Sequence, residues 1–107
     1  MITVRLRKNV KDQVYAFDIL DHGRGVVCAA VSVLSLNTVN AIEILTEEKF
    51  TCDYDQAGGR LQFALAAGAS GDCGHDALLL IDAMVMGLRG IQEEYAKQIE
   101  IVEVRQR

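Results

Sequence analysis

The 107-residue sequence contains no proline and no tryptophan, and aromatic residues make up only 6% of it. The absence of proline excludes Pro-rich linkers and segments that bind as polyproline helices. Cysteine is scarce too: Cys28, Cys52 and Cys73 are an odd number of widely spaced residues, which does not suit a disulfide framework. Neither sign of charge dominates, since 11 basic and 15 acidic side chains give a formal net charge of −4. That balance provides no overall attraction to nucleic acid, and we expect no direct nucleic-acid partner.

A secretory signal and a long membrane-crossing run are also missing. The first residues, MITVRLRK, include no apolar core of a signal peptide. The longest apolar stretches, residues 26–36 and 77–86, are shorter than the about 20 residues that cross a membrane as a helix. We therefore expect a soluble, cytoplasmic protein with no membrane partner. In that reducing compartment a cysteine is available as a thiolate nucleophile.

The sequence does contain short alternating segments and two long apolar ones. Half of the residues are hydrophobic, which suits one core and a single domain over residues 1–107. Alternation predicts strands and 3.6-residue spacing predicts helices. The predicted strands cover residues 2–7, 13–20, 49–54, 60–66 and 98–104, and the predicted helices cover residues 26–45 and 75–96. The order ββαββαβ predicts an α+β fold, a two-layer sandwich with two helices on one face of a mostly antiparallel five-stranded sheet.

The two helices are more apolar than one sheet requires. The first is apolar on nearly every side of its first half, and so is the beginning of the second. One sheet cannot cover both helices, so we expect a homodimer that packs through helix surfaces. Gly87 and Gly90 each weaken the second helix by about 1 kcal/mol relative to alanine, and we interpret them as sites of close packing. Tyr15, Phe17 and Ile19 are expected to share the apolar face of the second strand.

Cys28 and His22 form the arrangement that suggests catalysis. His22 follows the second predicted strand, and Cys28 lies near the first turn of the next helix, with five residues between the two. A helix N-terminus carries about half a positive charge and unsatisfied N–H groups, which favour a thiolate and can stabilise an oxyanion. An adjacent imidazole can take the thiol proton and return it to a leaving amine. Spacing alone fits equally a small core cysteine and a solvated loop histidine.

Other polar residues support weaker hypotheses. Cys73 and His75, even with Cys52, fall short of the four ligands of a structural zinc site, so we expect no metal and no cofactor. We interpret Cys52 as a core residue of its strand and Cys73 as a loop thiol. Five arginines could line a basic sheet edge, although solvated strand faces are the simpler interpretation: Arg5, Arg7, Arg60, Arg105 and Arg107.

The segment around Cys28 resembles a known family. Residues 26–34 read VVCAAVSVL, and together with the preceding histidine turn they resemble the ribosomal-processing cysteine protease family called Prp. A later pattern, Gly87-Leu88 with Tyr95, Ile99 and Val104, is similar to the end of that family. The resemblance covers essentially the whole chain and implies a small, dimeric bacterial cysteine protease. It also implies the substrate, a precursor of the twenty-seventh large-subunit ribosomal protein, whose N-terminal extension is removed after an aromatic residue.

The same resemblance implies roles for single residues. Cys28 is the expected nucleophile and His22 the expected general base. Ser32 matches a serine of the family, one helical turn after the nucleophile, where it would support the site. A helix serine bonded back to a carbonyl is an equally simple interpretation of Ser32.

The chain departs from the family pattern near the histidine. Asp21 stands where the family has glycine, Gly25 stands where it usually has aspartate, and the loop between His22 and Cys28 is shorter than usual. The short loop is either a real deletion or a segment missing from the sequence as read. The alternative function is therefore a catalytically impaired module of the same dimeric fold that binds ribosomal protein without cutting it.

Overall fold

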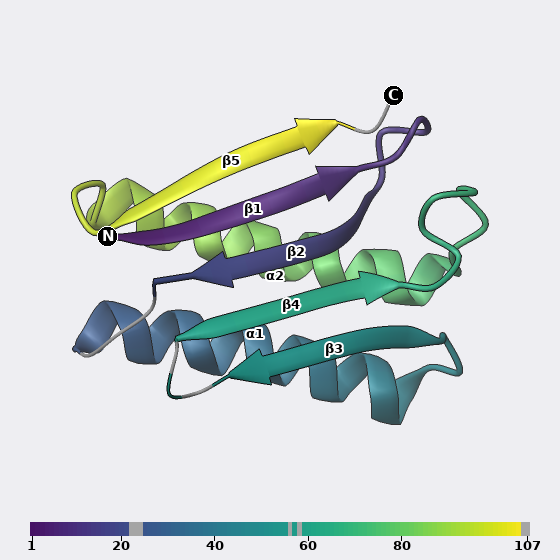
Figure 1. Cartoon of the computed structure of the whole chain (residues 1–107), viewed down its shortest axis with the longest axis horizontal. Helices are drawn as coiled ribbons and strands as arrows, with labels where there is room; N and C mark the ends of the chain where they lie inside the picture. Colours follow the sequence, from purple (N-terminus) through teal and green to yellow (C-terminus); the bar gives the residue numbers. More distant parts are fainter. Residues whose placement is uncertain (22–24, 56, 58, 106–107) are drawn as a thin grey trace.

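Five strands and two helices follow one another in the order ββαββαβ (Figure 1). The structure, a computed structural model, describes residues 1–21, 25–55, 57 and 59–105. The strands are β1 (Ile2–Lys8), β2 (Val14–Leu20), β3 (Phe50–Asp55), β4 (Arg60–Leu65) and β5 (Ile99–Arg105), and the helices are α1 (Val26–Leu45) and α2 (His75–Glu94). The predicted α+β order is confirmed, and the predicted ends differ from the observed ones by two residues at most.

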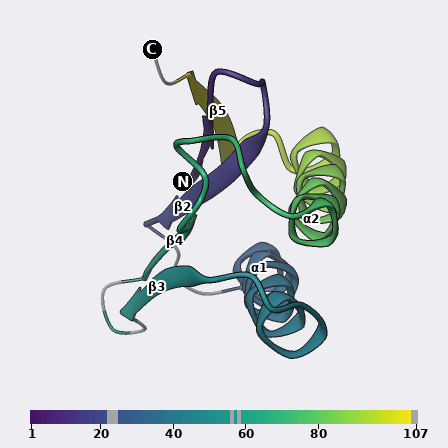
Figure 2. The same ribbon diagram turned by 90° about the vertical axis from the view of Figure 1, so that its right-hand side faces the viewer.

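The strands form one mixed sheet in the order β3-β4-β2-β1-β5. Three of the four strand pairs are antiparallel, and β5 pairs with β1 in parallel. Both helices cover the same face of this sheet, with α2 over the β1–β5 side and α1 over the β3–β4 side (Figure 2). The predicted two-layer sandwich with a mostly antiparallel sheet is therefore confirmed.

The β1–β2 hairpin contains a register shift that the sequence pattern did not predict. Pairing runs from Thr3 with Leu20 to Arg7 with Ala16, and Lys8 then pairs with Val14. The extra residue places Val14 in the core, and the guanidinium of Arg7 lies 6.0 Å from the centre of the Tyr15 ring. The prediction that Tyr15 belongs to the buried face is therefore wrong, because a bulge breaks the two-residue period.

The core fills the space between the sheet and the helices. Phe63 of β4 stacks on Phe17 of β2, with ring centroids 5.0 Å apart, and lies 5.1 Å from Phe50 of β3. Aliphatic side chains of the two helices complete the same cluster, including Val31 and Ile42 of α1 with Ile81 and Leu88 of α2. One continuous core of this kind is what a single domain requires.

Helix α1 extends beyond the apolar stretch 26–36 with which it begins. It has 20 residues, and its most apolar window has a mean hydropathy of 1.6, so length and composition alone would allow it to cross a membrane. The apolar stretch 26–36 is itself shorter than a membrane span, but the helix continues through Asn37 and Asn40 to Leu45 and so reaches that length. Val27, Val31 and Ile42 are nevertheless buried in the fold, as in the core helix of a sandwich.

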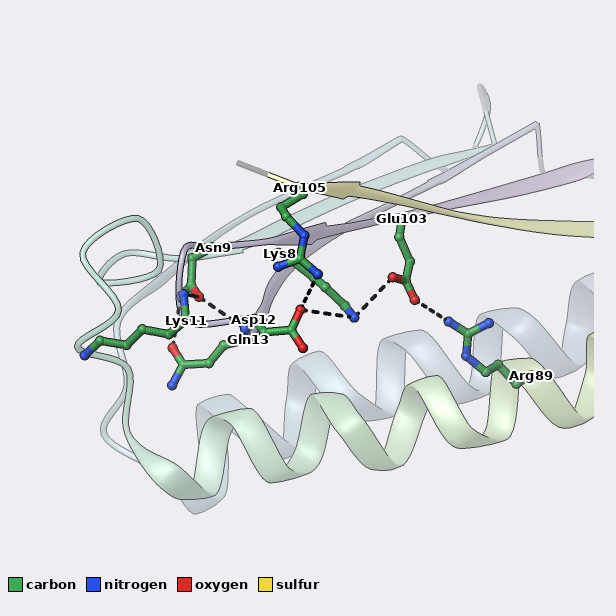
Figure 3. A network of polar contacts seen from close by, with 8 residues as sticks. All are labelled: Lys8, Asn9, Lys11, Asp12, Gln13, Arg89, Glu103 and Arg105. Atoms are coloured by element: carbon green, nitrogen blue, oxygen red, sulfur yellow. Dashed lines mark hydrogen bonds and ion pairs between the residues drawn. The ribbon is translucent and has the colours of Figure 1, made fainter. Parts of the chain in front are cut away.

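Polar contacts fasten the C-terminal strand to the rest of the fold (Figure 3). Arg105 of β5 donates to the carboxylate of Asp12 in the β1–β2 turn, and Lys8 lies between Asp12 and Glu103. Glu103 also accepts from Arg89 of α2 at 2.8 Å. The hydrogen bond from Arg105, and then the charges of Arg105 and Lys8, hold the pKa of Asp12 below its ordinary value. These contacts lie at the end of the sheet away from Cys28.

Candidate active site

Cys28 is the third residue of α1 and is half-buried against the core. Gly25 precedes the helix with φ 104° and ψ 178°, a conformation that is essentially restricted to glycine. No side chain in the described part of the chain caps this end, and the first turn has no acidic residue. The positive end of the helix dipole and the first amide N–H groups are therefore not neutralised by the helix's own side chains.

His22 lies outside the described residues, so its contact with Cys28 stays a prediction. The residues that border its loop are described: Asp21 follows β2 with φ 59°, and Gly25 begins the turn into α1. A positive φ suits aspartate better than most residues, because its short polar side chain tolerates the left-handed region. Residues 22–24, which include His22, lie in the sequence between the end of β2 and the start of α1.

Ser32 is half-buried and lies one turn beyond Cys28 on α1. Residues four apart on a helix share a face, so Ser32 and Cys28 are neighbours along α1. Back-bonding of the kind considered for Ser32 is seen at Ser35 and Thr38, whose hydroxyls donate to the carbonyls of Val31 and Leu34 at 2.7 Å. The supporting role of Ser32 stays a prediction.

The other two cysteines lie in less favourable surroundings for nucleophilic chemistry. Cys52 of β3 is exposed, so the prediction that it is a core residue is wrong: β3 is the outermost strand and α1 leaves it largely uncovered. Desolvation, and secondly the Asp53 carboxylate, raises the pKa of Cys52. Cys73 precedes α2 as predicted, and desolvation followed by the charges of Glu48 and Asp72 raises its pKa. Both thiols are therefore less ionised at neutral pH than an unperturbed cysteine.

The described residues offer no metal cluster, since no three histidine, cysteine, aspartate or glutamate side chains converge. His75 instead lies 3.2 Å from Asp76 on the first turn of α2. A hollow of about 680 Å³ lies between the end of α1 and the beginning of α2. Leu45 on its rim is 17 residues along the helix from Cys28, about 25 Å away.

The arginines considered for a basic edge are mostly engaged with carboxylates. Arg5 and Arg7 both flank the buried Asp18 on the sheet face opposite the helices, at 3.8 and 3.4 Å. The two other described arginines form ion pairs with Asp53 and Asp12: Arg60 and Arg105. Arg107 lies outside the described residues. Solvated, paired strand faces are thus the better description of this surface.

Comparison with known proteins places these residues in a family context. A family profile described as cysteine protease Prp matches residues 1–100. The ribosomal processing cysteine protease Prp of Staphylococcus aureus strain Mu50 is 34% identical over 82 residues, which are 76% of this chain and 73% of that protein.

Two solved structures of the S. aureus protease have nearly the same fold. The structure described as a complex with a covalently linked product peptide has a TM-score of 0.87 at 30% identity, and covers 97% of this chain and 100% of the other. The structure described as a complex with a substrate peptide has a TM-score of 0.86 at 29% identity, with the same coverage. The S. aureus protease thus holds a product peptide covalently in one structure and a substrate peptide in the other, on a fold that this chain shares almost entirely.

Proposed function

Because this chain belongs to the cysteine protease Prp family, we propose that it cuts the N-terminal extension from a large-subunit ribosomal protein precursor, with Cys28 as nucleophile and His22 as general base. The family resemblance implies the twenty-seventh protein of that subunit as the substrate. The observation that carries the proposal is the place of Cys28, in the first turn of α1 and within the segment VVCAAVS. No metal or cofactor is needed for this chemistry.

The expected reaction is acyl transfer in two steps. His22 accepts the Cys28 proton, and the thiolate attacks the carbonyl carbon of the scissile peptide bond. The oxygen that becomes negatively charged can be stabilised by N–H groups at the start of α1. When the C–N bond breaks, the imidazolium protonates the departing amine, and a thioester to Cys28 remains. Water then attacks the thioester, His22 takes its proton, and the carboxylic acid product leaves while the thiol is restored.

Measuring peptide cleavage by variants with one substitution each tests the roles of Cys28 and His22. The substrate is a synthetic peptide that spans the extension and the first residues of the ribosomal protein, and mass spectrometry follows its products. Cys28→Ala removes the nucleophile and should abolish cleavage, whereas His22→Ala removes the general base and should lower kcat by about 10²- to 10⁴-fold. Cys73→Ala is the matched control and should cleave at the wild-type rate. Unchanged cleavage by Cys28→Ala would refute the mechanism.

The alternative, a binding module without catalysis, draws support from two features. Cys28 packs partly against the core, as a structural cysteine would, and Gly25 and Asp21 depart from the family pattern around the histidine. Under this alternative the chain binds the precursor peptide, and the Cys28→Ala variant binds it equally well. The reactivity of the Cys28 thiol separates the two functions.

A homodimer is part of the proposal. The outer surface of the helix layer carries exposed apolar side chains from both helices: Val26, Val33, Ile44, Leu79 and Met86. Residues of this kind gathered on one surface of a small soluble protein indicate an interface. The occupant that the family resemblance favours is a second copy of the chain, related by a two-fold axis.

A further inference from the structure

Strand β3 is an edge strand of the sheet to which a further strand could be added. It lies at the end of the strand order, and within the described part of the chain only β4 pairs with it. Every residue of β3 except Phe50 is exposed. Its register with β4 is continuous from Phe50 to Asp55, and its sequence FTCDYD contains neither proline nor lysine. Bulges, prolines and lysines are common means of preventing strand addition at an edge, and β3 has none of them.

The register shows which backbone groups of β3 point away from β4. Ala66 donates to the carbonyl of Lys49 at 2.8 Å, so Lys49 is in a hydrogen-bonded position of the antiparallel ladder. Such positions recur every second residue, at Thr51 and Asp53 along the strand. The N–H and C=O groups of the residues between them, including Cys52 and Tyr54, therefore point outward along the edge. The side chains of these same residues lie on the sheet face that the helices cover.

Cys28 lies on the flank of α1 that is nearer to the β3 edge. Leu34 contacts the α2 position Gly87 and so marks the flank of α1 that faces α2. At 100° per residue, Cys28 lies about 120° around the helix from Leu34, and Ser32 lies within about 40° of Cys28. Val31, between the two flanks, is fully buried against the sheet. Cys28 and Ser32 consequently occupy the flank away from α2, on the β3 side of the molecule (Figure 2).

The chain directions of α1 and β3 show which part of β3 lies nearest to Cys28. Helix α1 begins at the end of the molecule where β3 terminates, so the two run in opposite directions (Figure 1). Tyr54, near the end of β3, therefore lies at the Cys28 end, whereas Phe50 lies at the other end and packs on Phe63. Tyr54 is 41% exposed as a residue, so a bound group can contact it without any rearrangement of the core.

We propose that the edge of β3 binds the substrate peptide as an added strand, with Tyr54 as its main side-chain contact. The outward N–H and C=O groups of Cys52 and Tyr54 pair with the peptide backbone, and the strand so formed carries the scissile carbonyl past the start of α1. Strand addition recognises an extended backbone first and side chains second. Strand β5, the other edge, lies on the far side of the sheet from β3 and α1. The inference deepens the proposed function and rests on it for the identity of the peptide.

Binding to an inactive variant tests the edge separately from catalysis. A fluorescein-labelled peptide that spans the extension and first residues of the twenty-seventh large-subunit ribosomal protein is titrated with Cys28→Ala protein, and anisotropy gives the Kd. Tyr54→Ala in this background should weaken binding about tenfold, as loss of an aromatic anchor does. Tyr95→Ala is the matched control, because Tyr95 is 39% exposed at the end of α2, and it should leave the Kd unchanged. Far-UV circular dichroism and melting curves establish that both variants are folded.

A backbone scan of the peptide tests strand pairing itself. Single N-methyl groups, placed at successive residues around the cleavage site, remove one N–H each. Strand addition predicts that every second N-methyl group raises the Kd, because alternate N–H groups of an added strand face β3. In proteins that cleave, KM should follow the same alternation.

The outcomes separate this inference from the proposed function. An unchanged Kd for Tyr54→Ala, or N-methyl effects without alternation, would overturn strand addition even if the wild type cleaves normally. Tyr54-dependent, alternating binding without cleavage by the wild type would overturn the protease and preserve the edge. Failure of the wild type to cleave, combined with failure of the Cys28→Ala protein to bind the peptide, would overturn both.

Discussion

At the residue scale, the three cysteines differ in their electrostatic surroundings. Cys52 and Cys73 each have a carboxylate nearby and are partly desolvated, and both effects raise the thiol pKa. Cys28 lies in the first turn of α1, and that turn contains no acidic side chain. A thiolate at a helix N-terminus is stabilised by the dipole and by the amide N–H groups. At neutral pH the raised pKa values of Cys52 and Cys73 should therefore make both thiols less reactive than an unperturbed cysteine.

Alkylation kinetics should show this difference. In a short pulse of iodoacetamide at pH 7, Cys28 should be labelled at least about tenfold faster than Cys52, although Cys52 is the more exposed thiol, because desolvation and the Asp53 carboxylate raise the pKa of Cys52 and so lower its thiolate fraction. Peptide mapping by mass spectrometry gives the rate at each cysteine. Raising the pH should speed up Cys52 and Cys73 as their thiols ionise. A Cys28 that reacts only in denaturant would favour the binding module without catalysis.

At the element scale, the two glycines of α2 have different roles. A β-carbon at Gly87 would lie 2.6 Å from Cδ2 of Leu34 on α1, so glycine at this position allows the helices to approach. A β-carbon at Gly90 would have nothing within 4 Å. The prediction that both glycines permit close packing is therefore confirmed for Gly87 and wrong for Gly90. Helix spacing places the two residues about 60° apart around the axis, and only one of them meets α1.

Alanine substitutions measure that contact. Gly90→Ala should raise the free energy of unfolding by about 0.5–1 kcal/mol, because alanine favours the helix and nothing obstructs its methyl group. Gly87→Ala gains the same helix propensity but forces Leu34 to move, at a cost of about 1 kcal/mol or more. Urea denaturation should therefore find Gly87→Ala less stable than Gly90→Ala by at least about 1 kcal/mol. Equal stability of the two variants would show that α1 does not pack tightly at Leu34.

At the scale of the whole molecule, the two outer surfaces differ in polarity: the sheet face is charged and the outer helix surface is apolar. The sheet face opposite the helices carries paired charges, such as Arg5 and Arg7 around Asp18. The outer helix surface instead exposes Val33 on α1 and Met86 on α2. The homodimer is expected through the second surface, because burial of exposed apolar side chains drives association.

Sedimentation equilibrium should find a particle of twice the 11.7 kDa chain mass. Val33→Glu combined with Met86→Glu places charges on the expected interface and should shift the equilibrium to monomers. Val102→Glu, at a partly exposed valine of the opposite sheet face, is the control and should stay dimeric. A monomeric wild type, or a dimer that withstands the double substitution, would contradict an interface through the helices.

The sequence by itself determined the elements, their order and the candidate nucleophile. Alternating residues in β1 and the long apolar spacing of α1 are local patterns, and local backbone preference and amphipathicity suffice to produce them. Cys28 could be placed at a helix start for the same reason, and the VVCAAVS segment pointed to the family before any fold was known.

Only the tertiary structure decided which elements meet. Periodicity shows that a face is apolar, but not which partner covers it, so Cys52 was expected in the core and lies on an exposed edge strand. The contact of Gly87 with Leu34 and the parallel pairing of β5 with β1 likewise depend on residues far apart in the chain. The β3 edge beside Cys28 exists for this same reason, since packing of α1 against the sheet, rather than any short motif, places the two together.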